Sequence, residues 1–236
     1  MAVDLLVFGP HPDDIEIGMG GTIARHGALG LKVGLCDLTA GELGSNGTVE
    51  QRLAEAEAGR VALDAAWREN LRWPDRRIGK DPSQLDEAVG FLRRHRPRVV
   101  AVPYWSDRHP DHEAASALLT EAVFNSGLRR YRAEGDAWRP AWICYYFIND
   151  AATPSFVVDV SDYYAKKRRA LDCHASQFVR PGPGKDANGA VDTRLNAPTF
   201  RQLVESRDAQ FGALAGVAWA EGFVVREAIV RDSLMR

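Results

Sequence analysis

The sequence predicts a single α/β domain, with a Rossmann-like, mostly parallel sheet and helices on both faces. Short apolar runs rich in β-formers alternate with helical patterns through residue 125, which is typical of right-handed βαβ units. The length of 236 residues fits one large domain, so we expect one unit spanning residues 1–236. The composition, 45% hydrophobic and 26% charged, is that of a globular protein.

The first half of the chain alternates regularly between the two kinds of element. Gly9 and Pro10 end the first apolar run, and Gly27 and Gly30 end the first helical pattern. Later helical patterns carry alanine, valine and leucine at the spacing of one helix face. In chain order we expect a strand at 3–8, a helix at 18–29, a strand at 32–38, a loop at 39–48, a helix at 49–63, a strand at 69–73, a helix at 82–95, a strand at 99–103 and a helix at 113–124.

The second half is less regular. Four consecutive basic residues at 166–169 are expected to form a solvent-facing side of their helix. Residues 180–197 are rich in glycine, proline and asparagine and predict a long loop, which is a candidate mobile lid. The other elements are expected as strands at 142–148, 155–160 and 222–230 and as helices at 163–174 and 200–214.

Charge and cysteine content exclude several classes of protein. The net charge of −2 gives no electrostatic basis for a nucleic-acid or membrane partner. No apolar run approaches the ~20 residues that span a bilayer, and residues 3–8 are too short for a signal peptide. The cysteines are too widely spaced for a metal knuckle or a disulfide framework, so we expect reduced thiols and a cytoplasmic location. They are Cys36, Cys144 and Cys173.

Two similar clusters of histidine and aspartate each follow an expected strand. The clusters are His11-Pro12-Asp13-Asp14 and His109-Pro110-Asp111-His112. Active sites of parallel α/β sheets lie past the carboxyl ends of the strands, so both clusters are expected at one site. A single segment of this kind is also typical of a helix N-cap. The presence of two favours a metal site.

The residue types suit a catalytic metal ion. Catalytic zinc takes three protein ligands and keeps one position for water. His11, Asp14 and His112 supply such a set, which Fe²⁺ or Co²⁺ would also accept. Asp13 is adjacent to a ligand and is the natural general base, since a metal ion lowers the pKa of water towards 7.

The other histidines are expected in different roles. His109 would stabilise a tetrahedral oxyanion or protonate a leaving amine, with the Asp111 carboxylate orienting its ring. His174 is placed near the site. His26 and His95 lie at expected helix ends and are interpreted as surface caps.

These motifs resemble those of zinc-dependent N-acetylglucosamine deacetylases related to LmbE and PIG-L. The resemblance touches nearly the whole chain and is nearest to the branch that deacetylates N-acetylglucosaminyl malate in bacillithiol biosynthesis. Besides the two clusters, it is carried by Glu42-Leu43-Gly44-Ser45-Asn46-Gly47-Thr48, Arg52, Ser176-Gln177-Phe178 and Glu221-Gly222-Phe223.

The resemblance implies the same metal ligands and base, and it adds substrate-binding residues. Arg52 and Arg108 would face a carboxylate or sugar hydroxyl, since the planar guanidinium binds carboxylates bidentately. The alternative for Arg52 is an ion pair on a helix surface. Glu42, Ser45 and Asn46 would line the sugar site, or else only form turns. Relatives often form trimers or hexamers, so a homo-oligomer is expected.

The sequence-based interpretation is therefore metal-dependent removal of the acetyl group from an N-acetylglucosamine conjugate, preferably N-acetylglucosaminyl malate. The alternatives are another small N-acetyl sugar (a chitooligosaccharide or inositol-linked glucosamine), a non-catalytic sugar-binding protein, and a nucleotide-binding protein. The GxGxxG spacing that the last would need is absent. Some family members supply a tyrosine hydroxyl to the oxyanion, where this chain has Phe200. Trp105 is interpreted as either a sugar-stacking platform or a core aromatic.

Overall fold

The computed structural model describes residues 2–180, 190–228 and 230. The described residues form one seven-stranded sheet in the order β3-β2-β1-β4-β5-β7-β6. Only β7 runs antiparallel to its neighbours, which confirms the predicted mostly parallel α/β fold. The strands are β1 (Leu5–Gly9), β2 (Val33–Thr39), β3 (Trp67–Trp73), β4 (Val99–Pro103), β5 (Trp142–Tyr146), β6 (Phe156–Asp159) and β7 (Ala220–Val224).

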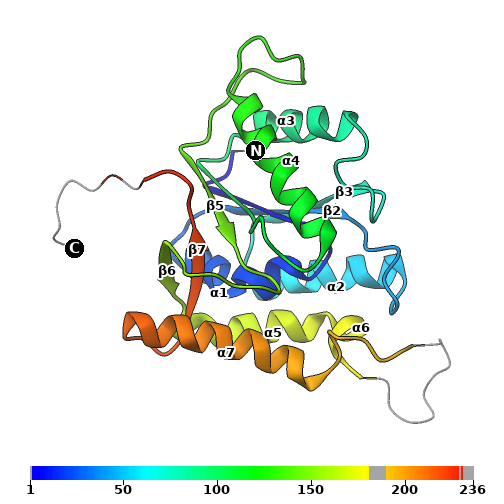
Figure 1. Cartoon of the computed structure of the whole chain (residues 1–236), viewed down its shortest axis with the longest axis vertical. Coiled ribbons are helices and arrows are strands. Elements are labelled where there is room, and N and C mark those ends of the chain that lie inside the picture. The colour runs from blue at the N-terminus through cyan, green and yellow to red at the C-terminus, as the bar shows by residue number, and fades with distance from the viewer. Residues whose placement is uncertain (1, 181–189, 229, 231–236) are drawn as a thin grey trace.

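Helices cover both faces of this sheet, as predicted (Figure 1). α3 and α4 pack together on one face, while α1 and α2 lie on the other with α5 packed against both. α7 packs on β7. The helices are α1 (Asp14–Ala28), α2 (Val49–Ala62), α3 (Ser83–His95), α4 (Pro110–Ser126), η1 (Ser161–Tyr163), α5 (Tyr164–Cys173), α6 (Ala175–Phe178) and α7 (Pro198–Ala215).

The first helix begins earlier than the sequence pattern indicates. α1 starts at Asp14 and is kinked at Met19, whose φ of −149° and ψ of 28° are not helical. The expected start at residue 18 therefore corresponds to the segment after the kink. At the other end of the chain, β7 ends at Val224, whereas the expected strand continued to residue 230.

Close packing fixes the start of α1 against the centre of the sheet. β1 and β2 are buried along their whole length, as expected for parallel strands covered on both faces. A Cβ at Gly18 would lie only 2.1 Å from the Tyr146 ring, so this position requires glycine. The Tyr146 hydroxyl donates to the Phe8 carbonyl at 2.7 Å. The residues that precede α1 are thereby held at one edge of the sheet.

The basic run at 166–169 is not uniformly solvent-facing, and the prediction for Lys167 is wrong. Lys167 is fully buried, and its Nζ donates to Asp208 Oδ2 (2.7 Å) and Glu221 Oε1 (2.6 Å). It lies three residues after Tyr164, which is also buried, so both occupy the inner face of α5. Paired carboxylates are needed there because desolvating an isolated ammonium group is costly.

Replacing Lys167 with alanine is expected to lower the free energy of unfolding by about 3–5 kcal/mol, because Glu221 would remain buried without a cation and Asp208 would keep only its ion pair with Arg207. Lys166 provides a matched control, since its ion pair with Asp64 is partly exposed. The change Lys166→Ala should stay within about 0.5 kcal/mol of wild type. Urea denaturation measures both; equal effects would contradict the role of Lys167.

The prediction that His95 is a surface cap is also wrong. The side chain is buried, and its ring centroid lies 4.4 Å from those of Trp67 and Phe91. Its Nε2 lies 3.3 Å from Glu69 Oε1. His95 follows Phe91 by four residues, so it shares that core-facing side of α3. His26, by contrast, is half-exposed in the last turn of α1, as predicted.

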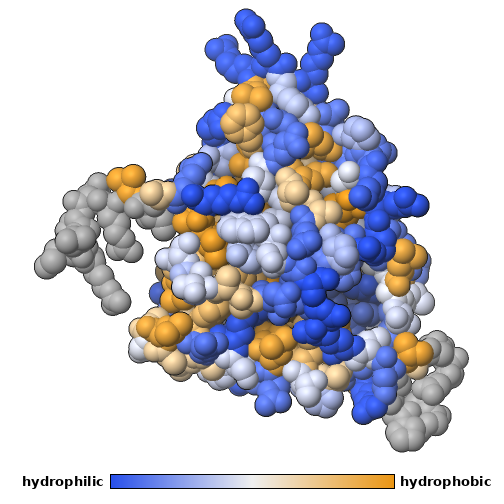
Figure 2. Space-filling view, viewed as in Figure 1, coloured by the Kyte–Doolittle hydropathy of each residue, from blue (hydrophilic) through white to orange (hydrophobic). Residues whose placement is uncertain are grey.

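Other composition-based predictions can be compared with the structure. Cys36 and Cys144 are buried and Cys173 is half-buried, and all three are free thiols. Within the described residues, every helix falls short of the length or apolar character that crossing a membrane requires. Figure 2 shows apolar side chains scattered among hydrophilic ones on the face it presents.

Candidate metal centre and active site

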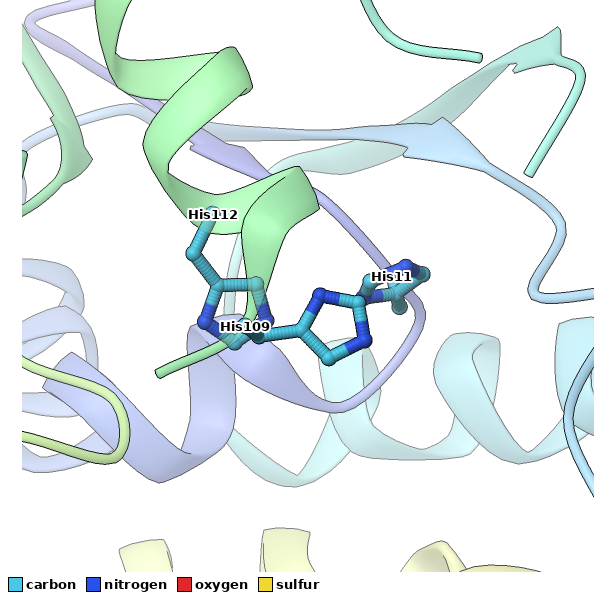
Figure 3. A group of neighbouring side chains, drawn as sticks. All are labelled: His11, His109 and His112. Carbon is cyan, nitrogen blue, oxygen red and sulfur yellow. The ribbon is translucent and has the colours of Figure 1, made fainter. Parts of the chain in front are cut away.

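The two histidine clusters meet at the carboxyl edge of the sheet. β1 and β4 are adjacent parallel strands, so the turn that holds His11 lies beside the start of α4, which holds His112. Figure 3 shows the imidazoles of His11, His109 and His112 close together. The ring centroids are 4.9 Å apart for His11 and His109, 5.6 Å for His11 and His112, and 4.7 Å for His109 and His112.

Asp14 connects two of these histidines. Its Oδ2 lies 3.0 Å from His11 Nδ1 and 3.3 Å from His112 Nε2. It also accepts the backbone N–H of His11 at 2.9 Å. Burial alone would raise the pKa of Asp14, but His112 and His11 hold that pKa well below its usual range. The three residues predicted as metal ligands therefore form one buried group.

In both His11 and His112, the ring nitrogen that faces away from Asp14, here called the far nitrogen, lies beside a carboxylate. His112 Nδ1 lies 3.0 Å from Asp107 Oδ1. His11 Nε2 lies 3.3 Å from Asp75 Oδ1 and 3.4 Å from Asp111 Oδ2. A carboxylate on the far nitrogen fixes the tautomer and leaves the near nitrogen free to bind a metal ion. His112 Nε2 and His11 Nδ1 are the near nitrogens here.

The electrostatics of this group also suit a cation. Although burial lowers the pKa of His112, the carboxylates of Asp14 and Asp107 raise it to about 9. A buried surplus of carboxylates favours a bound divalent ion, and imidazole with carboxylate is a set that zinc and related metals accept. Ligand atoms lie within 4.8 Å of one another in two groups, His11 with His109 and His112, and His11 with Asp75 and Asp111.

Asp13 lies in the turn between β1 and α1. Its φ of 136° is rare for a residue with a side chain, and backbone strain of this kind clusters at functional sites. Burial raises the pKa of Asp13 to about 6, with Arg52 opposing the shift and Asp14 adding to it. Its side chain lines the same pocket as His11 and His112. Such a carboxyl group is suited to proton transfer.

Arg52 supports this turn from α2. Its guanidinium donates to the carbonyls of Gly41 (2.9 Å) and Pro12 (3.1 Å), and to Asp13 Oδ2 at 3.4 Å. The side chain is buried, so it is not the surface ion pair that sequence reasoning kept open. Gly41 has a φ of +65°, and a Cβ there would lie 1.9 Å from Arg52 Nη1. These contacts position Asp13, and Arg52 also lines the pocket that contains His11 and His112.

Replacing Arg52 with alanine is therefore expected to lower kcat by about 10- to 100-fold with little change in KM, because the proposed base loses its support. Arg52→Lys should recover only part of the rate, since lysine lacks the fork that spans two carbonyls. Steady-state kinetics separate kcat from KM. A large rise in KM at unchanged kcat would instead assign Arg52 to substrate binding.

The site opens into a pocket of about 500 Å³. Arg108 and Ser45 line it, as expected of substrate-binding residues. Glu42 and Asn46 are not among the described residues that line it. The Glu42 carboxylate accepts a backbone N–H of the β3–α3 loop at 2.6 Å. The Asn46 amide bonds both the N–H (2.8 Å) and the carbonyl (2.9 Å) of Val191, so both residues hold loops at the pocket.

His109 and Asp111 interact through the backbone rather than through the expected carboxylate. The N–H of Asp111 donates to His109 Nδ1 at 3.2 Å, which leaves the proton of the neutral ring on Nε2. Burial, His112 and His11 lower the pKa of His109 and favour that neutral ring. The Asp111 carboxylate instead accepts from Arg76 at 3.0 Å and lies beside His11. His109 is therefore an Nε2–H donor.

Sequence reasoning missed three residues that support the imidazoles: Asp75, Asp107 and Asn149. Asn149 donates its backbone N–H and its side-chain amide to Asp107, both at 3.0 Å. Asp107 lies two residues before the second cluster, and Asp75 follows the end of β3. Both positions were visible as acidic residues near strand ends. The partner of Asp75, His11, is far away in the sequence, whereas Asp107 lies only five residues before His112 and could have been found from that spacing.

The aromatic residues separate into a pocket wall and a core. Phe200 is buried and lines the pocket, and no tyrosine is among the described lining residues. Trp105 lies 4.4 Å from Tyr104 between ring centroids, and the Arg226 guanidinium lies 4.5 Å from the Trp105 ring. Trp105 is outside the described pocket lining, which favours the core interpretation over a sugar platform.

Half of the expected lid at 180–197, residues 181–189, lies outside the described residues. In the described part, Thr193 and Leu195 line the pocket. His174, placed near the site by sequence reasoning, is fully buried with Nε2 3.2 Å from Glu16 Oε1. It is not among the described residues that line the pocket.

Known proteins match this chain in both sequence and structure. Residues 6–123, half of the chain, match the PIG-L family model, GlcNAc-PI de-N-acetylase. A diacetylchitobiose deacetylase from Thermococcus kodakarensis is 31% identical over 189 residues, which cover 74% of this chain and 70% of that protein. A 1D-myo-inositol 2-acetamido-2-deoxy-alpha-D-glucopyranoside deacetylase from Rhodococcus erythropolis is 30% identical over 233 residues, covering 80% and 75%.

A solved structure extends the similarity to the whole fold. The conserved protein TT1542 from Thermus thermophilus superposes with a TM-score of 0.88 at 37% identity, covering 99% of both chains. The matched family segment contains both histidine clusters. The chain therefore belongs to the PIG-L, or LmbE-like, family of deacetylases.

Proposed function

We propose that the protein, as one domain spanning residues 1–236, hydrolyses the N-acetyl group of an N-acetylglucosamine conjugate with the help of a bound metal ion. The observation that carries this proposal is the buried group of His11, Asp14 and His112 beside the Asp13 carboxyl. Family membership supports the reaction class. The pocket of about 500 Å³ has room for an amino sugar and a second group.

His11, Asp14 and His112 are the proposed metal ligands. Both imidazoles have their far nitrogen held by carboxylates. Asp14 is preferred to His109 as the third ligand because its Oδ2 contacts both rings, while His109 Nδ1 already accepts a backbone N–H. Zn²⁺, Fe²⁺ or Co²⁺ fits this set. When bound, the metal supplies Lewis-acid activation of water and of the amide carbonyl.

Asp13 is the proposed general base and takes the proton of the attacking water, with Arg52 holding its carboxylate. His109, oriented by the Asp111 backbone, donates from Nε2 to the developing oxyanion. The proton that Asp13 took from the water then passes to the leaving amine as acetate separates, which returns Asp13 to its carboxylate form and leaves His109 neutral. Phe200 has no hydroxyl to offer, so His109 is the protein donor that we assign to this oxygen.

The preferred substrate is N-acetylglucosaminyl malate, which would give glucosaminyl malate and acetate in bacillithiol biosynthesis. The support for an anionic second group is an arginine at the pocket, since Arg76 is already paired with Asp111 and Arg108, among the described residues, is not. Arg76 and Arg108 both line the pocket, and Arg108 has no ion-pair partner within the described part of the chain. Arginine binds carboxylates bidentately. Arg52 also lines the pocket, but the carbonyls of Gly41 and Pro12 already accept hydrogen bonds from its guanidinium, so we assign the carboxylate to Arg108.

The alternative substrates are a chitooligosaccharide and inositol-linked N-acetylglucosamine. The relatives support these equally, since proteins at 31% and 30% identity are named for diacetylchitobiose and for an inositol glycoside. A neutral second group has no charge for Arg108 to bind. The effect of replacing Arg108 on the KM of each substrate therefore distinguishes a charged from a neutral second group.

Acetate release should be measured in parallel with N-acetylglucosaminyl malate, N,N′-diacetylchitobiose and inositol-linked N-acetylglucosamine. We expect the highest kcat/KM with the malate conjugate. Arg108→Ala should raise KM for that substrate about tenfold, the loss of one charge-assisted contact, and leave the neutral substrates unchanged. An equal loss on all three would exclude a carboxylate-binding role. Activity on none, with metal bound, would reject the deacetylase proposal.

A further inference from the structure

A second pocket lies at the opposite edge of the sheet, and we call it the basal pocket. Its volume is about 200 Å³, and it shares no lining residue with the active-site pocket. β5 pairs with β7 only through Tyr145 and Tyr146, so the first half of β5 has no strand on that side. The basal pocket is lined by Asp4, Leu5, Met19, Thr22, His26, Leu31, Arg98, Val99, Trp142, Cys144, Phe156, Val158 and Phe223.

The walls of the basal pocket are mainly apolar and partly aromatic. Trp142 and Phe156 meet edge to face at 5.7 Å, and Phe156 stacks on Phe223 at 5.3 Å. An apolar cavity of about 150 Å³ is large enough to bind benzene. The basal pocket therefore has room for one six-membered ring with a small substituent.

The kink in α1 leaves one hydroxyl group without a partner at this pocket. After Met19, the backbone N–H groups of Gly21 and Thr22 donate to the Glu221 carboxylate (3.0 and 2.6 Å). A helical threonine commonly bonds the carbonyl four residues earlier, but the kink interrupts that turn. Thr22 Oγ1 is buried and has no hydrogen-bond partner among the described residues. A buried hydroxyl group without a hydrogen bond costs free energy, so binding of a molecule that supplies the missing hydrogen bond is favoured.

A second polar group in the pocket has a defined orientation. His26 Nδ1 lies 2.7 Å from the Thr22 carbonyl, which only accepts, so Nδ1 donates. In the neutral ring Nε2 is then an acceptor. At the rim, Arg98 and Asp4 pair with each other at 3.5 Å and cancel in charge. The pocket thus offers acceptors for one O–H group and no net charge for an ion.

We propose that the basal pocket binds a small uncharged aromatic molecule with one hydroxyl group, of the phenol class. The ring fills the space between Met19, Trp142 and Phe156. The hydroxyl group of the ligand donates a hydrogen bond to Thr22 Oγ1, and His26 Nε2 is the neighbouring acceptor. This binding is separate from deacetylation and uses none of the residues assigned to that reaction.

Fluorine NMR on the full chain tests the proposal with 4-fluorophenol and fluorobenzene, which differ by the hydroxyl group alone. We expect saturable binding of 4-fluorophenol with a Kd near ~1 mM, as ligand efficiency allows for so small a molecule. Thr22→Val should weaken 4-fluorophenol about fivefold, the loss of one net hydrogen bond, and leave fluorobenzene unchanged. Thr120→Val, a threonine on α4 outside the pocket, is the matched control.

Val158→Phe places a ring in the pocket from the edge strand β6 and should abolish binding of both probes. The proposal is overturned if the wild type shows no saturable binding of 4-fluorophenol below about 10 mM, or if Val158→Phe binds as wild type does. Should that variant not fold, a wild-type crystal soaked with 4-iodophenol decides: anomalous density in the basal pocket supports the proposal, and iodine only elsewhere, or nowhere, rejects it.

Discussion

Asp13→Asn is expected to lower kcat by about three orders of magnitude while metal stays bound, because the amide cannot accept the proton of the attacking water. The substitution preserves shape, and asparagine tolerates a positive φ better than most residues, so the strained turn should persist. Initial rates of acetate release give kcat, and metal analysis of the same sample gives the amount of bound metal.

The neighbouring carboxylates provide the comparison that makes this result specific. Asp111→Asn removes a carboxylate that contacts Arg76 and His11 but keeps the backbone N–H that orients His109. It should therefore lower the rate far less than Asp13→Asn. If the two variants lose equal activity, or if Asp13→Asn retains a near-normal rate, Asp13 is not the base.

Asp14→Ala is expected to lower metal affinity by more than about 100-fold, because loss of a ligand should exceed the 10- to 100-fold effect of losing an outer carboxylate. Asp14 is the one carboxylate within 3.3 Å of both His11 and His112 in the described structure. Competition with a chromogenic chelator gives the affinity directly, without reference to substrate.

His109→Ala is the matched control for the ligand assignment. The ring of His109 lies near the other two imidazoles, so geometry alone allows it as a third ligand. In our assignment this variant keeps its metal and loses turnover. Full metal occupancy in Asp14→Ala together with metal loss in His109→Ala would reverse the assignment.

The sequence predicted the fold and the meeting of the two clusters because both depend on local signals. Alternating strand and helix patterns define a parallel sheet, and a cluster that follows each of two strands must reach the same edge. His11 and His112 are brought together in this way. No knowledge of their partners was needed.

The roles of individual polar residues were less predictable because they depend on contacts across the chain. The sequence around Arg52 allowed an ion pair on a helix surface, yet its side chain is buried and donates to the carbonyls of Gly41 and Pro12. Lys167 lies in a run of charges, which suggested solvent, although its three-residue spacing from Tyr164 placed it on the inner face. Asp75 was visible as an acidic residue after a strand, but no local signal predicted its contact with His11, which is distant in sequence.

The most direct test of the account is a metal titration of acetate release. Protein stripped with a chelator would be assayed on the three N-acetylglucosamine conjugates while Zn²⁺ is added back in measured amounts. We predict no acetate from the metal-free protein and a linear return of activity up to about one equivalent per chain. Full activity without metal, or none on any conjugate with the metal restored, would contradict it.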